Sequence, residues 1–248
     1  MMRTILAMSF LSGLFTPLGA LIVLRFRTLS ASVLAFILAL ASGVMASVVL
    51  TELMPASIHA GGILPFAIGC ASGILVMSGL GDLWHRPPGT GPEDPRHRLR
   101  RTGRSIALAI AVHDIPEGMA IGAGDMVHAQ LGAVIAVAMA LHNLPEGMSI
   151  AAPLSIGGMP RQKILGVTAA ISLVTPLGTL LPLMIGNLSN AVSAFTLALA
   201  SGAMIYVVAH DTLPESWQSQ KSLTLVGLLA GAGLMIGVAR MHTGMIPL

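Results

Sequence analysis

The fold is decided by a stretch of sequence that occurs twice, as LALASGVM at residues 38–45 and as LALASGAM at residues 197–204. The same spacing of 159 residues relates TPLG at 16–19 to TPLG at 175–178. A constant offset across two apolar segments and the loop between them indicates an internal repeat, because chance similarity among leucine- and alanine-rich helices would not keep one spacing. The first and second apolar segments are therefore predicted to match the sixth and the seventh.

The composition around this repeat is that of a membrane protein. Of the 248 residues, 54% are hydrophobic and only 9% are charged, whereas soluble proteins are about one quarter charged. The mean hydropathy is +0.85. Cys70 is the single cysteine, which excludes a disulfide framework and a multi-cysteine metal site. The basic sequence pI of 9.8 does not point to nucleic acid, because no soluble basic face can be built from this composition.

Eight apolar segments are long enough to cross a bilayer, which takes about 20 residues each. They cover residues 4–24, 31–54, 62–83, 104–124, 128–153, 162–186, 190–215 and 221–240. The first of them resembles a signal peptide in composition, but its place in the repeat favours a retained helix. We expect one all-α transmembrane domain over residues 1–248. Its parts are helices 1–3 (1–84), a basic cytoplasmic loop (85–104), helices 4–5 (105–153) and helices 6–8 (154–248).

The repeat also predicts how the two halves are oriented. Each repeated helix precedes its copy by five positions, an odd number, so the copies enter the membrane from opposite sides. This is the inverted-repeat plan of secondary transporters, in a 3+2+3 arrangement around helices 4 and 5. Most basic residues then fall on one side: Arg25, Arg27, Arg86, Arg96, Arg98, Arg100, Arg101, Arg104, Arg161, Lys163 and Lys221. By the positive-inside rule this side is cytoplasmic, and both termini are extracytoplasmic.

Two matching hexapeptides place ionisable residues inside predicted helices 4 and 5, as HDIPEG at residues 113–118 and HNLPEG at 142–147. A charged group at bilayer depth costs about 2.5–3.5 kcal/mol or more, so it marks a functional site. Residues four apart share a helix face, which pairs His113 with Glu117 and His142 with Glu146. The intervening prolines are expected to kink both helices. Two imidazoles and two carboxylates would then converge, with Asp114 and Asn143 nearby, and such donors suit zinc, manganese, iron and other divalent ions.

Other polar residues in the apolar segments are weaker candidates. Glu52 corresponds through the repeat to Asp211, which follows His210, and each acidic residue lies just before a proline. They are expected to line the mouths of a pathway or to meet water at helix ends. Met45 corresponds to Met204; a thioether can bind a soft metal, although methionine in a core is usually packing.

At these motifs the sequence resembles the ZIP (zinc–iron permease) family of divalent metal transporters, in particular its small bacterial members. The resemblance implies metal uptake toward the cytoplasm. It implies a primary site of His113, Glu117, His142 and Glu146 with Met45 as an additional ligand, a second site of Asp114 and Asn143 bridged by the two glutamates, and a route lined by Glu52, His210 and Asp211. Where some members carry a glutamate before Pro-Leu-Gly on helix 6, this chain has Thr175, which puts occupancy of the second site in question.

The function expected from these features is secondary transport or facilitated diffusion of a divalent metal across a bacterial inner membrane. Zinc is the expected substrate, with Mn²⁺, Fe²⁺, Cd²⁺ and Co²⁺ left open, and the sequence shows no P-loop for a primary pump. Two alternatives are an intramembrane metalloenzyme, although the His-Glu-x-x-His string of zinc proteases is absent, and a b-type haem protein that uses His113 and His142. We expect no enzymatic activity and no nucleic-acid partner, and a homodimer is one state that the sequence leaves open.

Overall fold

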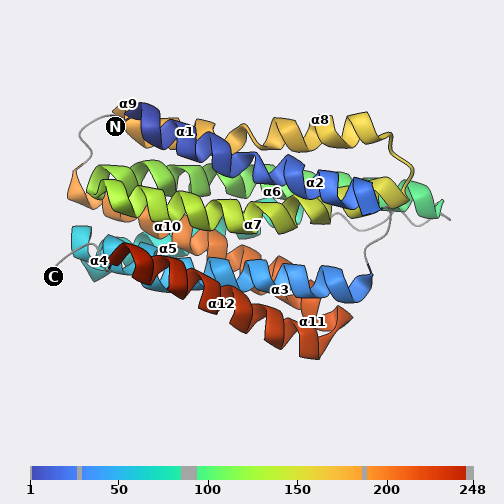
Figure 1. The fold of residues 1–248 in the computed structure, drawn as a ribbon. Helices are drawn as coiled ribbons and strands as arrows, with labels where there is room; N and C mark the ends of the chain where they lie inside the picture. The colour runs from blue at the N-terminus through green and yellow to red at the C-terminus, as the bar shows by residue number, and fades with distance from the viewer. Residues whose placement is uncertain (1, 27–29, 85–93, 186–188, 244–248) are drawn as a thin grey trace.

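The structure, a computed structural model, describes residues 2–26, 30–84, 94–185 and 189–243. Within these ranges every regular element is helical, and eight helical segments are long and apolar enough to cross a membrane. Helices are the expected solution, because backbone groups in lipid must satisfy their hydrogen bonds within the segment. The predicted class, an all-α integral membrane protein with eight spans, is confirmed (Figure 1).

Four spans are single helices and four are built from two or more pieces. The single helices are α5 (Ile63–Trp84), α6 (Pro95–Val127), α7 (Ala129–Ile156) and α12 (Lys221–Thr243). The divided spans are α1 (Met2–Gly13) with α2 (Phe15–Phe26), α3 (Ala31–Val48) with η1 (Val49–Leu53) and α4 (Met54–Gly61), α8 (Arg161–Ile171) with α9 (Val174–Ile185), and α10 (Asn190–Val207) with η2 (Val208–Thr212) and α11 (Leu213–Ser219).

The divisions fall where prolines interrupt the helical hydrogen bonding. Pro17 and Pro176 lack an N–H and crowd the carbonyl four residues earlier, which lies at the breaks before α2 and α9. The two π-helical turns, η1 and η2, directly precede the short helices α4 and α11. Each of these short helices has a proline near its first position, Pro55 in α4 and Pro214 in α11. The bounds of α2, α3 and η1 lie 159 residues before those of α9, α10 and η2, respectively.

Helix α6 begins earlier than we predicted. The sequence indicated a polar loop over residues 85–104, but the helix starts at Pro95, and residues 85–93 lie outside the described part of the chain. Proline suits the first helical position, where its missing N–H costs nothing. Asp94 caps the helix by accepting a hydrogen bond from the backbone N–H of Arg96 at 3.2 Å.

Helices α6 and α7 form an antiparallel pair that the other spans surround. Helix α9 packs on α6 and α2 packs on α7, whereas α10 contacts α6 and α3 contacts α7. On the outside, α12 packs on α3 and α5 packs on α10. Glycines allow the closest approaches: Gly118 of α6 lies against the backbone carbonyl of Thr175 in α9, and Gly147 of α7 lies against that of Thr16 in α2. The described ends of the chain lie at the same end of the bundle (Figure 1).

Candidate metal centre

The two hexapeptides lie opposite each other on α6 and α7. A tight turn at His128 joins these helices, so that the motif of α6 and the motif of α7 meet at the same depth of the bundle. Every ionisable side chain of the two motifs is buried, with exposed fractions between 0 and 3%: His113, Asp114, Glu117, His142 and Glu146. Both helices continue through their internal prolines, Pro116 and Pro145.

Each histidine pairs with the glutamate of the other helix. Nε2 of His113 lies 2.9 Å from Oε1 of Glu146, and Nε2 of His142 lies 3.0 Å from Oε2 of Glu117. The sequence predicted that the His and the Glu of one helix share a face. Because α6 and α7 pack antiparallel, the His of each helix then meets the Glu of the other helix. The result is a compact group of two imidazoles and two carboxylates contributed equally by the two helices.

The second nitrogen of His142 constrains the chemistry of its pair. Nδ1 lies 3.1 Å from the carbonyl oxygen of Ala138, one turn earlier on α7, and a carbonyl can only accept a hydrogen bond. Nδ1 therefore carries the hydrogen, and Nε2 of a neutral ring presents a lone pair to the carboxylate of Glu117. Nε2 of His142 and Oε2 of Glu117 are then two acceptors 3.0 Å apart, and they need a proton between them or a metal ion bound to both. Metal-binding histidines commonly have this arrangement, in which the other ring nitrogen donates to a carbonyl.

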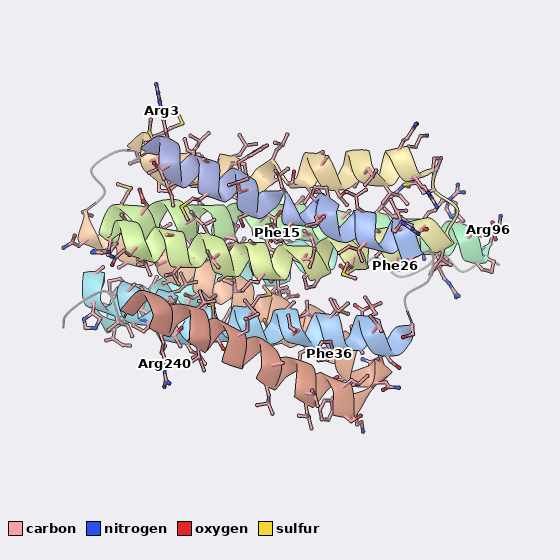
Figure 2. The ribbon with its side chains drawn as sticks, viewed as in Figure 1. Arg3, Phe15, Phe26, Phe36, Arg96 and Arg240 are labelled. Atoms are coloured by element: carbon pink, nitrogen blue, oxygen red, sulfur yellow. The ribbon has the colours of Figure 1, made fainter. Side chains whose placement is uncertain are left out.

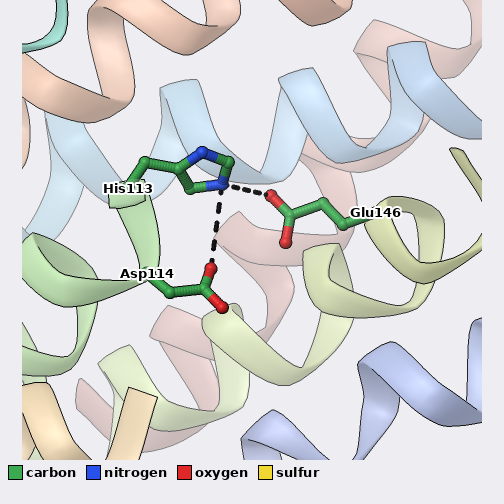
Figure 3. Close-up of side chains that lie close together, drawn as sticks. All are labelled: His113, Asp114 and Glu146. Atoms are coloured by element: carbon green, nitrogen blue, oxygen red, sulfur yellow. Dashed lines mark hydrogen bonds and ion pairs between the residues drawn. The ribbon is translucent and has the colours of Figure 1, made fainter. Parts of the chain in front are cut away.

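Asp114, the residue after His113 on α6, adds a third carboxylate close to the imidazole of His113. Its Oδ1 lies 3.8 Å from Nε2 of His113, so this nitrogen faces the carboxylates of both Asp114 and Glu146 (Figure 3). One ligand atom each from His113, Asp114 and Glu146 can be chosen so that all lie within 4.8 Å of one another. The same is true of Glu117, His142 and Glu146. Glu146 is common to the two groups, as a bridging ligand would be.

Several buried oxygens around these groups accept no hydrogen bond from the described residues. They are Asp114 Oδ1 and Oδ2, Glu117 Oε1, Glu146 Oε2 and Asn143 Oδ1. Leaving one buried polar group unpaired costs about 1–3 kcal/mol, and more when the group is charged. A structural pairing of each histidine with a glutamate would leave this cost in place, whereas a bound cation would be coordinated by these oxygens. The donor set of imidazole nitrogen and carboxylate oxygen fits zinc and related divalent ions.

Asn143 is held in one orientation by a backbone carbonyl that sequence reasoning missed. Its Nδ2 donates to the carbonyl oxygen of Ser12 in α1 at 3.1 Å, which leaves Oδ1 as the unpaired end of the amide. A main-chain carbonyl has no signature in the sequence, so no motif could have indicated this contact. Two buried hydroxyls, Thr16 Oγ1 and Thr175 Oγ1, likewise lack a partner among the described residues.

The remaining predicted residues are distributed along the bundle. Met45 is fully buried in an apolar cluster that also contains Met204 and Met139. Glu52 is half-buried in η1, where the hydroxyl of Thr51 donates to its Oε1 at 3.3 Å. The exposed ring of His210 stacks on Tyr206 with 4.6 Å between ring centroids. The backbone of Asp211 lies in η2, and its side chain falls outside the part that the structure describes.

A cavity of about 320 Å³ reaches the metal centre from one end of the bundle. His113 and Glu146 line it together with His210, and its other lining residues include Ser105 of α6 and Gln218 of α11. These lie near the arginine-rich start of α6. On the other side of the metal centre, toward the α6–α7 turn, the bundle is filled by the apolar cluster, whose members from these two helices include Ile121 and Met139. The centre is therefore accessible from the arginine-rich end.

A second cavity of about 400 Å³ lies beyond this apolar cluster, at the end of the bundle that holds the α6–α7 turn. His59 of α4, Met126 of α6 and Asn190 of α10 are among its lining residues. The apolar cluster thus separates two cavities at opposite ends of the molecule.

Comparison with known proteins finds the same family that the motifs resemble. A family model described as ZIP zinc transporter matches residues 85–239. The zinc transporter ZupT of Chlorobium luteolum is 33% identical over 251 residues, which covers 93% of this chain and 94% of that protein. ZupT of Akkermansia muciniphila is 32% identical, covering 91% of this chain and 92% of that protein. The zinc transporter ZIPB of Bordetella bronchiseptica is 32% identical, covering 89% and 75%. The chain therefore belongs to the ZIP family of zinc transporters.

Proposed function

We propose that this protein carries Zn²⁺ across the bacterial inner membrane into the cytoplasm through the metal centre between α6 and α7. Membership of the ZIP family makes the chain a transporter of divalent metal ions and not an enzyme. The named relatives are zinc transporters, which supports zinc as the substrate. Selectivity over Mn²⁺, Fe²⁺, Cd²⁺ and Co²⁺ would be measured by competition for uptake.

The observation that carries the site assignment is the set of unpaired buried oxygens around two His–Glu pairs. Glu117 and Glu146 each spend one carboxylate oxygen on a histidine and keep the other without a partner. In a bundle packed in lipid, a cation is the group that such oxygens need. The primary site would use His113, Glu117, His142 and Glu146, and Asp114 with the amide oxygen of Asn143 would supply further ligands. Met45 remains an additional ligand in this proposal.

The test is uptake of radioactive zinc by proteoliposomes that contain the purified protein. Glu117→Gln and Glu146→Gln keep the shape of the side chain and remove its charge, and each should lower the initial rate by at least about tenfold. Asp125→Asn is the matched control, since this buried carboxylate lies on α6 beyond the two hexapeptides. Wild-type rates in both glutamine variants would disprove the site, and a slow Asp125→Asn variant would point to a general effect of lost charge.

An inverted-repeat mechanism is also part of the proposal. Its support is the shared spacing of 159 residues between the bounds of α2, α3 and η1 and those of α9, α10 and η2. The repeated helices α2, α3, α9 and α10 contact α6 and α7, which carry the paired motifs, and transporters that alternate access around a central site are built in this way. The cavity at the arginine-rich end would be the cytoplasmic exit. The apolar cluster between the two cavities would have to separate for an ion to enter from the other side.

A further inference from the structure

The basic residues at one end of the bundle are concentrated on three neighbouring helices, α2, α6 and α8. Arg25 lies at the end of α2, Arg98 and Arg104 lie in the first part of α6, and Arg161 and Lys163 begin α8; all five side chains are exposed. Helix α8 packs on both α2 and α6. We call these five residues the basic patch.

The backbone under the basic patch is held by a sixth basic side chain. Arg100 donates from Nε to the carbonyl oxygen of Gly157 at 2.6 Å and from Nη2 to that of Gly158 at 3.1 Å. These glycines begin the short connection from α7 to α8, and Gly158 has a φ of +77°, which suits glycine. The first part of α6 is thereby tied to the connection that leads into α8, which keeps the backbones that carry the patch close together.

The basic patch lies at the depth expected for lipid headgroups. Helix α6 has 33 residues, or about 50 Å of helix, whereas the hydrocarbon core is about 30 Å thick. Arg104 lies one turn before Leu108, which is 54% exposed, and Arg25 lies one turn after Leu21, which is 48% exposed. An exposed leucine on a membrane-spanning helix faces lipid. Each of these arginines lies on the same helix face as its leucine, one turn closer to the end of the apolar part, where a long basic side chain reaches the membrane surface.

The charge of the patch is not balanced within these helices. Among the described residues of α2, α8 and the part of α6 before His113, no acidic residue occurs, and Asp94, which caps α6, offsets only one of the five positive charges. At the opposite end, the described arginines are Arg3 and Arg240, on α1 and α12 (Figure 2). On the other helices at the basic end, Lys221 lies over the ring of Trp217 at 5.8 Å.

We propose that the basic patch binds the headgroups of anionic phospholipids, which thereby hold the ends of α2, α6 and α8 at one membrane surface. Guanidinium groups suit phosphate because they donate two parallel hydrogen bonds. Clusters of basic residues next to a membrane-spanning helix attract anionic lipid by about 1 kcal/mol per residue. A signal for membrane orientation alone needs only the charges, not the placement of Arg25 and Arg104 one turn from the lipid-facing leucines of α2 and α6. The proposal does not depend on which metal is carried.

The test measures the selectivity of the purified protein for spin-labelled phosphatidylglycerol over spin-labelled phosphatidylcholine by electron paramagnetic resonance. The wild-type protein should prefer the anionic lipid by at least about fivefold, the ratio that a single basic residue near an anionic surface would give. The preference should fall with rising salt, because the attraction is screened. Equal association of the two lipids with the wild-type protein would overturn the proposal without any variant.

Variants locate the effect. Glutamine in place of all five residues, Arg25, Arg98, Arg104, Arg161 and Lys163, should abolish the preference, whereas lysine in place of the four arginines should retain part of it. The matched control, Arg3→Gln with Arg240→Gln, removes two charges at the other end and should leave it unchanged. An unchanged preference in the glutamine variant would refute the assignment to this patch. Excess soluble glycerol phosphate should not displace the labelled lipid, and displacement would mean that the patch binds free phosphate groups instead.

Discussion

Thr175 is the residue at which this chain's metal centre differs most from what its family resemblance implies. Its side chain is fully buried and its hydroxyl has no partner among the described residues. Its backbone carbonyl lies against Gly118, one residue after Glu117. A hydroxyl carries no charge and is a weaker ligand for a divalent cation than a carboxylate. In the proposed site, three carboxylates would therefore serve the centre, which favours one tightly bound ion.

We predict that Thr175→Glu raises the metal content of the purified protein from one zinc ion toward two, because the added carboxylate supplies the missing ligand. Zinc per protein would be measured by inductively coupled plasma mass spectrometry after equilibration and desalting. Thr175→Gln is the control, since it has the same size without the charge, and it should bind one ion. If both variants bind one ion, position 175 does not decide how many ions the centre holds.

If His113 and His142 are ligands as proposed, metal binding is sensitive to pH. A histidine must be unprotonated to bind zinc, so protons compete with the ion for His113 and His142. We predict that zinc affinity falls as the pH is lowered and that binding releases protons. Isothermal titration calorimetry in buffers of different ionisation enthalpy measures both. A zinc affinity that is constant from pH 7.5 to pH 5.5 would exclude histidine as a ligand.

At the scale of helices, two glycines set how closely the outer spans approach the central pair. A Cβ atom at Gly147 would meet the backbone carbonyl of Thr16, and one at Gly118 would meet that of Thr175. Backbone atoms of packed helices cannot rotate away as a side chain can. The metal-bearing helices and the proline-interrupted spans α2 and α9 therefore fit only while these positions stay free of a side chain.

We predict that Gly118→Ala and Gly147→Ala each destabilise the protein by about 1–3 kcal/mol, the usual cost of overpacking, and also slow zinc uptake. Thermal unfolding in detergent, followed by circular dichroism, measures the stability. Gly237→Ala is the matched control, because a Cβ there meets no other atom within 4 Å, and it should change the stability by less than about 0.5 kcal/mol. Equal melting temperatures for all three variants would contradict the close packing.

The elements were predictable to the extent that hydropathy and spacing define them. Eight apolar segments and the pairing of the two hexapeptides on adjacent helices follow from residue type and position. Which histidine meets which glutamate does not, because it depends on the packing of α6 against α7. The contact from Asn143 to the carbonyl of Ser12 and the cavity beside His113 also arise from tertiary packing. The early start of α6 was missed because Pro95 and the arginines after it were interpreted as loop residues.

For the whole molecule, the uneven distribution of basic residues predicts the orientation in the membrane. We expect Arg3→Cys to react with a membrane-impermeant maleimide on intact cells, and Arg98→Cys to react only after the membrane is opened. Both would be made in a Cys70→Ser background, since Cys70 is the single native cysteine. Labelling of Arg98→Cys on intact cells, with Arg3→Cys protected, would show the reverse orientation and would make the cavity beside His113 an entry instead of an exit.

The pairing of His113 with Glu146 and of His142 with Glu117 lies wholly within one helical hairpin, α6 and α7. This has a consequence for biogenesis. A nascent chain that delivered these residues to the lipid one helix at a time would expose each ionisable group to hydrocarbon. Delivered as a hairpin, each imidazole and carboxylate can share a proton across the 2.9 or 3.0 Å between them and enter as a pair without net charge. The two histidines and two glutamates of the hairpin thus compensate one another before α8 to α12 have been synthesised, and Asp114 is the one buried carboxylate of the motifs left outside these pairs.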